Sequence, residues 1–413
     1  MKKIVITGLG VLASNGQGKD NFWRALQAGV AGYGPLTVFD PEPFRVKQAA
    51  EIKDFDAKVY LGPKGFRTLD RSSRLAVSAT KCAIEDSGFQ IDDTNSPDVG
   101  VALGTTFGSL QSIVDFDTVI LKEGPRYTNP GLFPNTVINA PGSQISIWHN
   151  IQGFNTTIAT GFTASLDAMK YAYDFLQLDR VKVVYTGGLE ELCWPLFMGL
   201  HSLQFLSGSR EGQTFVNCPF DLRRNGITLG EGACVMAMED YDHAVKRGAR
   251  IMAEVLSFGH YFDPYRINKY NPRGTGMVKA MRAALDGAGL EAGDIDYICA
   301  NANSTLAADK IECQAIQDVF GARAKMIPVS AVKSMVGECY SVSGALAVAA
   351  SLGALEKDFI PPTINYANPD PDCPLDVVPN TARSARVNRI LINNFSPTGN
   401  QACMVIARAG SAA

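Results

Sequence analysis

The fold is decided by the stretch Asn155-Thr-Thr-Ile-Ala-Thr-Gly-Phe-Thr-Ala-Ser-Leu-Asp-Ala-Met169. Its first half is rich in β-branched residues and predicts a buried strand, and Thr160-Gly161 predicts a sharp turn. From Thr163 onward apolar residues recur at helical spacing, which predicts a helix. Many enzymes present a nucleophile on such a strand-to-helix turn, because the helix dipole favours an anion there. Here the residue at the tip is Phe162, which has no nucleophilic atom.

Composition predicts a large buried core. The 413 residues are 46% apolar and 19% charged, and the length suits two lobes. With a net charge of −3 and no long Lys/Arg run, we expect no nucleic-acid binding. The longest apolar run after the first strand, residues 345–355, is too short to cross a bilayer, so we expect no membrane partner. Nine cysteines without a C-x-x-C pair indicate reduced thiols in a cytoplasmic protein.

The order of elements indicates an α/β fold with an internal repeat. A strand is predicted at 4–7, ended by a turn at Gly8-Leu-Gly10. A helix at 72–86, a stop at Gly88 and a strand at 99–103 recur downstream as a helix at 277–285, a stop at Gly287-Ala-Gly289 and a strand at 295–300. The repeat predicts two lobes built on one plan, residues 1–250 and 251–413, with helices covering buried sheets.

Between the strand at 99–103 and the Phe162 turn lies a long insertion, residues 106–152. A probable helix carries Phe107, Leu110 and Val114, and a loop rich in Gly, Pro and Asn follows it. Long insertions in compact lobes are often functional or lie at interfaces, so we expect this one to contact a partner.

Taken together, several motifs resemble the β-ketoacyl synthase family of the thiolase superfamily. They span the whole chain in order: Val5-Ile-Thr-Gly-Leu-Gly-Val11, Phe22-Trp23, Asp70-Arg-x-x-Arg74, Gln144-Ile-Ser-Ile147, Pro219-Phe-Asp221, Gly230-Glu-Gly-Ala233, Lys333-Ser-Met-x-Gly337 and Asn394-Phe395. The resemblance implies a thiolase-like α/β fold, with two pseudo-symmetric lobes and mixed sheets in five alternating layers of helix and sheet.

The same resemblance implies where catalytic residues would stand. In the family a Cys accepts the acyl chain, and two His residues assist decarboxylation and carbon–carbon bond formation. Matching motif by motif, the Cys position is Phe162 and the two His positions are Asn301 and Glu338, while the family's Lys is retained as Lys333. The family residue whose backbone N–H helps form the oxyanion hole matches Pro397, which has no N–H.

A condensing-enzyme scaffold without its catalytic set resembles the chain-length factor, the β subunit of type II polyketide ketosynthases. The resemblance implies a heterodimer with an active ketosynthase α subunit, an acyl carrier protein as a further partner, and a growing polyketide chain in a shared tunnel. We assign Phe107, Leu110 and Val114 as tunnel or interface residues on that basis, and expect neither a cofactor nor a metal site. Glu338 in a buried pocket should pair with Lys333.

Two alternatives stay open from the sequence. The chain could be a homodimeric acyl-transfer or cyclising enzyme using Glu338 and Lys333, or a noncatalytic scaffold for an acyl carrier protein. Arg67, Arg71 and Arg74 have the spacing of one helical face, which suits either a solvated surface or a docking site for an acidic carrier protein.

Overall fold

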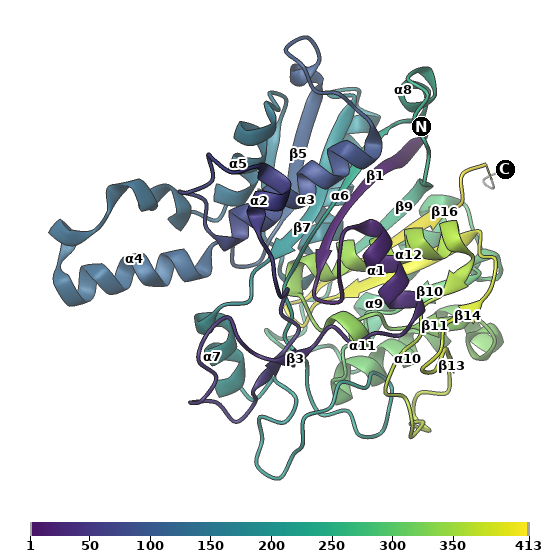
Figure 1. Ribbon diagram of the computed structural model, residues 1–413. Coiled ribbons are helices and arrows are strands. Elements are labelled where there is room, and N and C mark those ends of the chain that lie inside the picture. Colours follow the sequence, from purple (N-terminus) through teal and green to yellow (C-terminus); the bar gives the residue numbers. More distant parts are fainter. Residues whose placement is uncertain (1, 411–413) are drawn as a thin grey trace.

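The computed structural model describes residues 2–410 and contains a 12-stranded sheet whose two mixed halves join at a single strand pair; we call these halves the first and the second sheet (Figure 1). In the first sheet the order is β6 (Asn155–Ile158), β5 (Val99–Gly104), β7 (Val183–Glu190), β8 (Gly232–Asp240) and β1 (Ile4–Ala13). In the second it is β11 (Pro328–Ser330), β10 (Tyr297–Cys299), β15 (Arg389–Phe395), β16 (Asn400–Ala407) and β9 (Ala253–Phe262), with β13 (Asp376–Val377) beside β11. Three parallel strands and two antiparallel ones follow the same order in both sheets, which confirms the predicted pseudo-symmetry. β1 and β9 pair only at Ile4–Ile6.

Helices form three layers around these two sheets. α6 (Ala164–Gln177) and α12 (Ser343–Lys357) lie between the sheets, where they share one apolar cluster with residues of both. α3 (Arg71–Ser87) and α5 (Ala140–His149) cover the outer face of the first sheet, and α9 (Thr275–Ala288) and α10 (Leu306–Phe320) cover that of the second. The predicted five-layer arrangement is therefore confirmed.

The remaining helices and strands lie outside these layers or connect them, and all except α4 are short. They are α1 (Lys19–Gln27), α2 (Ala57–Leu61), α4 (Leu110–Glu123), α7 (Trp194–Ser202), α8 (Tyr241–Lys246), α11 (Lys333–Val336), β2 (Gly16–Gln17), β3 (Gly34–Pro35), β4 (Gln48–Ala49), β12 (Phe359–Ile360) and β14 (Arg383–Ser384). No helix within residues 2–410 is both long enough and apolar enough to cross a membrane. Arg250, where we place the lobe boundary, lies in the connection between α8 and β9.

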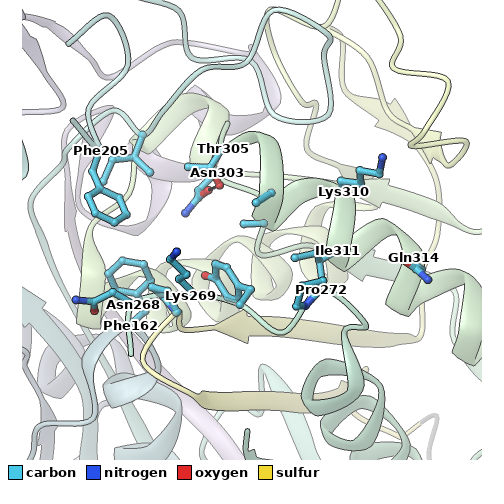
Figure 2. A pocket seen from close by; sticks show the side chains of 15 residues that line it. Phe162, Phe205, Asn268, Lys269, Pro272, Asn303, Thr305, Lys310, Ile311 and Gln314 are labelled. Atoms are coloured by element: carbon cyan, nitrogen blue, oxygen red, sulfur yellow. Dashed lines mark hydrogen bonds between the residues drawn. The ribbon is translucent and has the colours of Figure 1, made fainter. Parts of the chain in front are cut away.

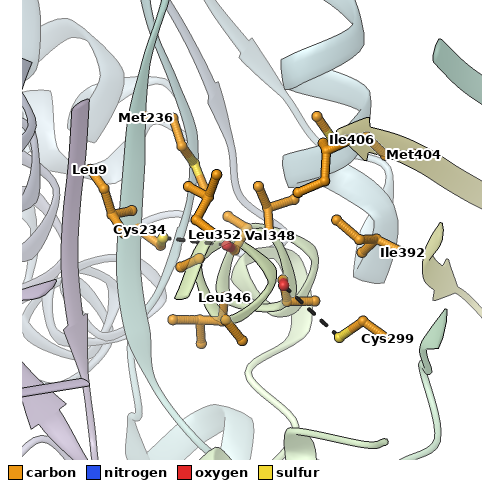
Figure 3. Close-up of a cluster of buried hydrophobic side chains, with 14 of the residues drawn as sticks. Leu9, Cys234, Met236, Cys299, Leu346, Val348, Leu352, Ile392, Met404 and Ile406 are labelled. Atoms are coloured by element: carbon orange, nitrogen blue, oxygen red, sulfur yellow. Dashed lines mark hydrogen bonds between the residues drawn. The ribbon is translucent and has the colours of Figure 1, made fainter. Parts of the chain in front are cut away.

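The central helix α12 is buried along almost its whole length, and Figure 3 shows its side chains between the two sheets. Cys234 of β8 donates its S–H to Ala345 O at 3.4 Å, and Cys299 of β10 donates to Ala347 O at 3.9 Å. All nine cysteines are free thiols, and eight of them are buried. These thiols act as small apolar side chains that also satisfy helix carbonyl groups.

Two predictions about strands are wrong, for physical reasons that the structure supplies. β1 does not turn at Gly8-Leu-Gly10 but continues to Ala13, and its glycines let α3 pack closely: a Cβ on Gly10 would lie 1.8 Å from Ala79 O. Gly259 has the same role in β9, where a Cβ would lie 1.9 Å from Ala280 O of α9. β6 is an edge strand bonded only to β5, with Asn155 exposed and Thr156–Ile158 half-buried, so it is not a buried strand in this chain.

The predicted insertion, residues 106–152, contains α4, two short 3₁₀ segments and α5. Figure 1 shows α4 and the segment after it extending away from the body of the protein. None of the residues of α4 is buried. We call residues 110–139 the arm.

Candidate functional site

Phe162 stands at the tip of the predicted strand-to-helix turn. β6 ends at Ile158, Gly161 adopts a left-handed φ of 75°, and a single 3₁₀ turn leads into α6. The Phe162 side chain is buried, and its ring meets the Tyr340 ring edge-on, with centroids 4.3 Å apart. The turn therefore presents an aromatic ring at the N-terminal end of a buried helix.

Two cavities meet at Phe162. One, of about 540 Å³, is mostly apolar and extends from Phe162 along Tyr270 to Lys310; we call it the Tyr270 cavity. Figure 2 shows Phe162 and Phe205 at one end of it and Lys310 and Gln314 at the other. The second, of about 330 Å³, includes Phe107, and we call it the Phe107 cavity. Both are lined by Phe162, Phe205, Asn268 and Pro397, so these side chains form the wall between them.

Lys333, Glu338 and Asn301 form a buried polar network next to this wall. Lys333 Nζ lies 2.9 Å from Glu338 Oε2 and donates to Asn301 Oδ1 at 2.8 Å. Glu338 also accepts hydrogen bonds from Asn303 Nδ2 at 2.9 Å and Ser343 Oγ at 2.6 Å. The predicted Glu338–Lys333 ion pair is thus confirmed. Both oxygens of Glu338 are engaged, which leaves the carboxylate poorly placed to move a substrate proton.

A second buried carboxylate, that of Glu312, is hydrogen-bonded to the same network. Glu312 Oε1 accepts from the backbone N–H of Asn301 at 2.8 Å and from Asn393 Nδ2 at 2.9 Å. Burial raises the pKa of Glu312 to about 7. Tyr270 donates its hydroxyl to Phe395 O at 3.0 Å, and burial raises the pKa of Tyr270 well above its usual value. Sequence reasoning missed both residues, although the Asp309–Glu312 spacing on an otherwise apolar helix was a usable signal.

Pro397, in the loop between β15 and β16, lines the same two cavities as Phe162. The loop is closed by a hydrogen bond between the Ser396 and Thr398 hydroxyl groups at 2.7 Å. At position 397 the wall has no backbone N–H to donate, because proline lacks one.

The predicted tunnel residues separate into two groups. Phe107 lines the Phe107 cavity and packs against the Tyr340 ring at 5.5 Å, and Leu110 packs against the same apolar cluster as Phe162. Val114 lies one helical turn farther along the arm and is half-buried. A role for these residues in a partner's tunnel stays a prediction.

The predicted single face of Arg67, Arg71 and Arg74 is wrong. α3 begins at Arg71 because Asp70 caps it, so the exposed Arg67 lies outside the helix. Arg71 is held by a bidentate ion pair to the buried Glu231, at 2.6 and 2.9 Å. Arg74 lies over the Phe66 ring at 5.5 Å. Of the three, Arg67 is exposed and the other two are half-buried, and a role of any of them in carrier docking stays a prediction.

Comparisons with known proteins place this site in context. The chain matches the family model "Beta-ketoacyl synthase, N-terminal domain" over residues 1–244 and "Beta-ketoacyl synthase, C-terminal domain" over residues 252–367. It is 36% identical over 408 residues to a 3-oxoacyl-[acyl-carrier-protein] synthase 2 of Coxiella burnetii, covering 98% of this chain and 99% of that one. It is also 33% identical over 428 residues to a granaticin polyketide putative beta-ketoacyl synthase 1 of Streptomyces violaceoruber, covering both chains fully.

Solved structures give the same fold. A structure titled "The ishigamide ketosynthase/chain length factor" superposes with a TM-score of 0.92 at 32% identity, covering 99% of this chain and 100% of that one. A type II polyketide synthase ketosynthase in complex with its acyl carrier protein, AntDE:AntF, superposes with a TM-score of 0.90 at 26% identity and equal coverage. The chain therefore shares its fold, over nearly its whole length, with these two solved structures.

Proposed function

We propose that this chain, which belongs to the β-ketoacyl synthase family, is a noncatalytic subunit that sets product length in a type II polyketide synthase. The observation that carries the proposal is the buried Phe162 ring at the N-terminal end of α6, with Pro397 lining the same two cavities. One of the similar solved structures is itself titled a ketosynthase/chain length factor.

The residues at the site argue against condensation by this chain. A phenylalanine cannot form an acyl intermediate, so covalent catalysis is lost. Proline at 397 removes one candidate oxyanion donor, and loss of a single donor typically costs about 10²–10³ in rate. Asn301 and Glu338 are bound to Lys333 in place of the two histidines that the family resemblance calls for. This network also weighs against the alternative of an enzyme that uses Glu338 and Lys333.

The exposed apolar side chains of the arm support the proposal that this chain has an obligate partner. In the isolated chain its large apolar side chains face solvent: Leu121 is 84%, Tyr127 71% and Phe133 58% exposed. Exposed apolar surface of this kind marks an interaction site. An active ketosynthase α subunit is the occupant we propose, since it would supply the missing Cys and His residues. Leu110 and Val114, near the root of the arm, would then border the partner's tunnel and limit the polyketide chain.

Co-expression tests the proposal. The chain is produced alone and together with a candidate ketosynthase that retains Cys and both histidines, and each sample is assayed with loaded acyl carrier proteins. We expect a stable 1:1 complex whose activity is abolished by Cys→Ala in the partner and retained after Phe162→Ala in this chain. Condensation by the chain alone would instead show an active enzyme like its named relatives. Carrier binding without any ketosynthase complex would favour a scaffold.

A further inference from the structure

Contacts from distant parts of the chain fix the turn that carries Phe162. Thr106 Oγ1, just before the arm, donates to Gly161 O at 3.2 Å. Asn400 Nδ2, on β16 in the second lobe, donates to Thr160 O at 3.2 Å. Gly161 has a positive φ, and such a residue alone would leave the turn conformationally permissive. The restraint on Phe162 therefore comes from these tertiary contacts.

Asp167, in the first turn of α6, contacts three residues around this turn. Its Oδ2 accepts hydrogen bonds from the hydroxyl of Thr160 and, at 2.8 Å, from that of Thr163. Its Oδ1 lies 2.8 Å from His260 Nε2 on β9, a close contact that does not have hydrogen-bond geometry. His260 in turn stacks on the Phe258 ring at 6.0 Å. One carboxylate thus connects both sides of the Phe162 turn to a strand of the second lobe.

We infer that Asp167 is the positioning residue for Phe162, and that His260 anchors it to the second lobe. The two threonines stand two residues before and one residue after Phe162, so holding both hydroxyls fixes the direction in which the Phe162 side chain leaves the backbone. That direction places the ring against Tyr340 and between the Tyr270 and Phe107 cavities. Without the carboxylate the ring gains freedom to turn, and the two cavities join.

The inference rests on the proposed role of Phe162 as the wall of this chain's pocket, but its test needs no knowledge of the product. 4-Fluorophenylalanine is placed at position 162 and its ¹⁹F resonance is recorded in the chain alone, or in the partner complex if only the complex is soluble. We expect one line, displaced by the Tyr340 ring current. Asp167→Ala should broaden or split that line, and His260→Ala should do so less.

Matched variants separate positioning from general stability. Asp174→Ala, on the same helix, removes an exposed carboxylate that pairs only with Lys170, and should leave the line unchanged. Asp167→Asn keeps an oxygen that accepts one hydroxyl, so it should restore part of the wild-type signal. A ring that closes the wall about nine-tenths of the time lowers affinity for a ligand of the joined cavity about tenfold. A fluorescent long-chain fatty acid should therefore bind Asp167→Ala up to about tenfold more tightly than wild type.

Three outcomes decide the matter. An unchanged ¹⁹F line in Asp167→Ala, even with a lowered melting temperature, would overturn the positioning role. If Asp167→Ala does not fold, Asp167→Asn and His260→Ala carry the same comparison, and unchanged lines in both overturn the role. Several lines in the wild-type protein would show that Phe162 is not fixed at all, which overturns the wall itself. Failure of the proposed length-setting function would appear separately, as absence of a ketosynthase complex.

Discussion

Replacing Glu338 by Gln tests whether this residue is half of a structural ion pair or a catalytic group. Lys333 is 3% exposed and would lose the anionic oxygen at 2.9 Å, keeping only neutral acceptors, Asn301 Oδ1 at 2.8 Å and the amide oxygen of the substituted side chain. Removing one member of a buried pair leaves a desolvated charge and costs about 3–5 kcal/mol. Adding Lys333→Met removes that charge, so the double variant should recover most of the lost stability.

The assay is denaturant unfolding, followed in the wild-type chain, both single variants and the double variant. Asp372→Asn is the control, because its ion pair with Lys310 has a similar N–O distance of 2.6 Å but lies on the surface, so its loss should change little. In parallel the ketosynthase complex is assayed for product, which Glu338→Gln should leave unchanged in length and identity. Wild-type stability in Glu338→Gln, combined with loss of a turnover catalysed by this chain, would refute the structural reading.

Four further predictions address the remaining residues. Leu110→Trp should shorten the partner's product, measured by mass spectrometry, whereas Leu178→Trp at the far end of α6 should not; equal products from both would remove Leu110 from the tunnel. Phe162→Cys should acquire a thiol that alkylating reagents label but should not condense acyl groups at a measurable rate, since Asn301 and Glu338 stand at the two His positions and Pro397 has no N–H to donate. The pKa of Glu312 is raised from 4.5 to about 7, so the folded state holds a proton that the unfolded chain has lost. The contribution of Glu312 to stability should therefore fall by about 3 kcal/mol as pH rises from 4.5 to 7, and Glu312→Gln should remove that part of the profile in thermal melts. Arg71→Ala should destabilise the fold, by up to about 3–5 kcal/mol, because the buried Glu231 carboxylate loses its cation and keeps only backbone N–H donors, yet it should leave carrier affinity unchanged; a weakened carrier affinity in a stably folded variant would support Arg71 as part of the docking surface.

Local patterns in the sequence were sufficient for much of the fold. Helical spacing and a glycine stop predicted α3, and the structure ends that helix at Gly88 in the left-handed conformation. The same signals predicted α9 and Gly289. Gly10 was misread because its neighbours along the chain cannot show that a helix 70 residues later packs on it. β6 was misread because burial depends on strand order, and only β5 flanks it in this chain.

In the site too, local sequence patterns predict some features and miss those that depend on distant residues. Motif spacing located Phe162, Asn301, Lys333 and Glu338, and the structure places Lys333 within hydrogen-bonding distance of both Asn301 and Glu338. The partners that hold them were not predictable from spacing. Asp167 and His260 are 93 positions apart in sequence, and the partner of Arg71 is 160 positions away. Pairings of that range follow from the packing of whole lobes, which no local pattern records.

The network around Lys333 explains how a buried pocket can hold a charged residue that has no part in catalysis. A buried ammonium group is costly unless an anion and further acceptors surround it. Glu338 supplies the anion and Asn301 a neutral acceptor, so the charges of the pair sum to zero within the pocket. The close packing of α3 on β1 and of α9 on β9 is made possible by glycines in the two strands, which lie against the helix backbone. This packing does not depend on the side chains of Lys333, Glu338 or Asn301. The ion pair and the hydrogen bond are therefore enough to explain why Lys333 is buried in this pocket. Its presence alone is no evidence that this chain catalyses a reaction.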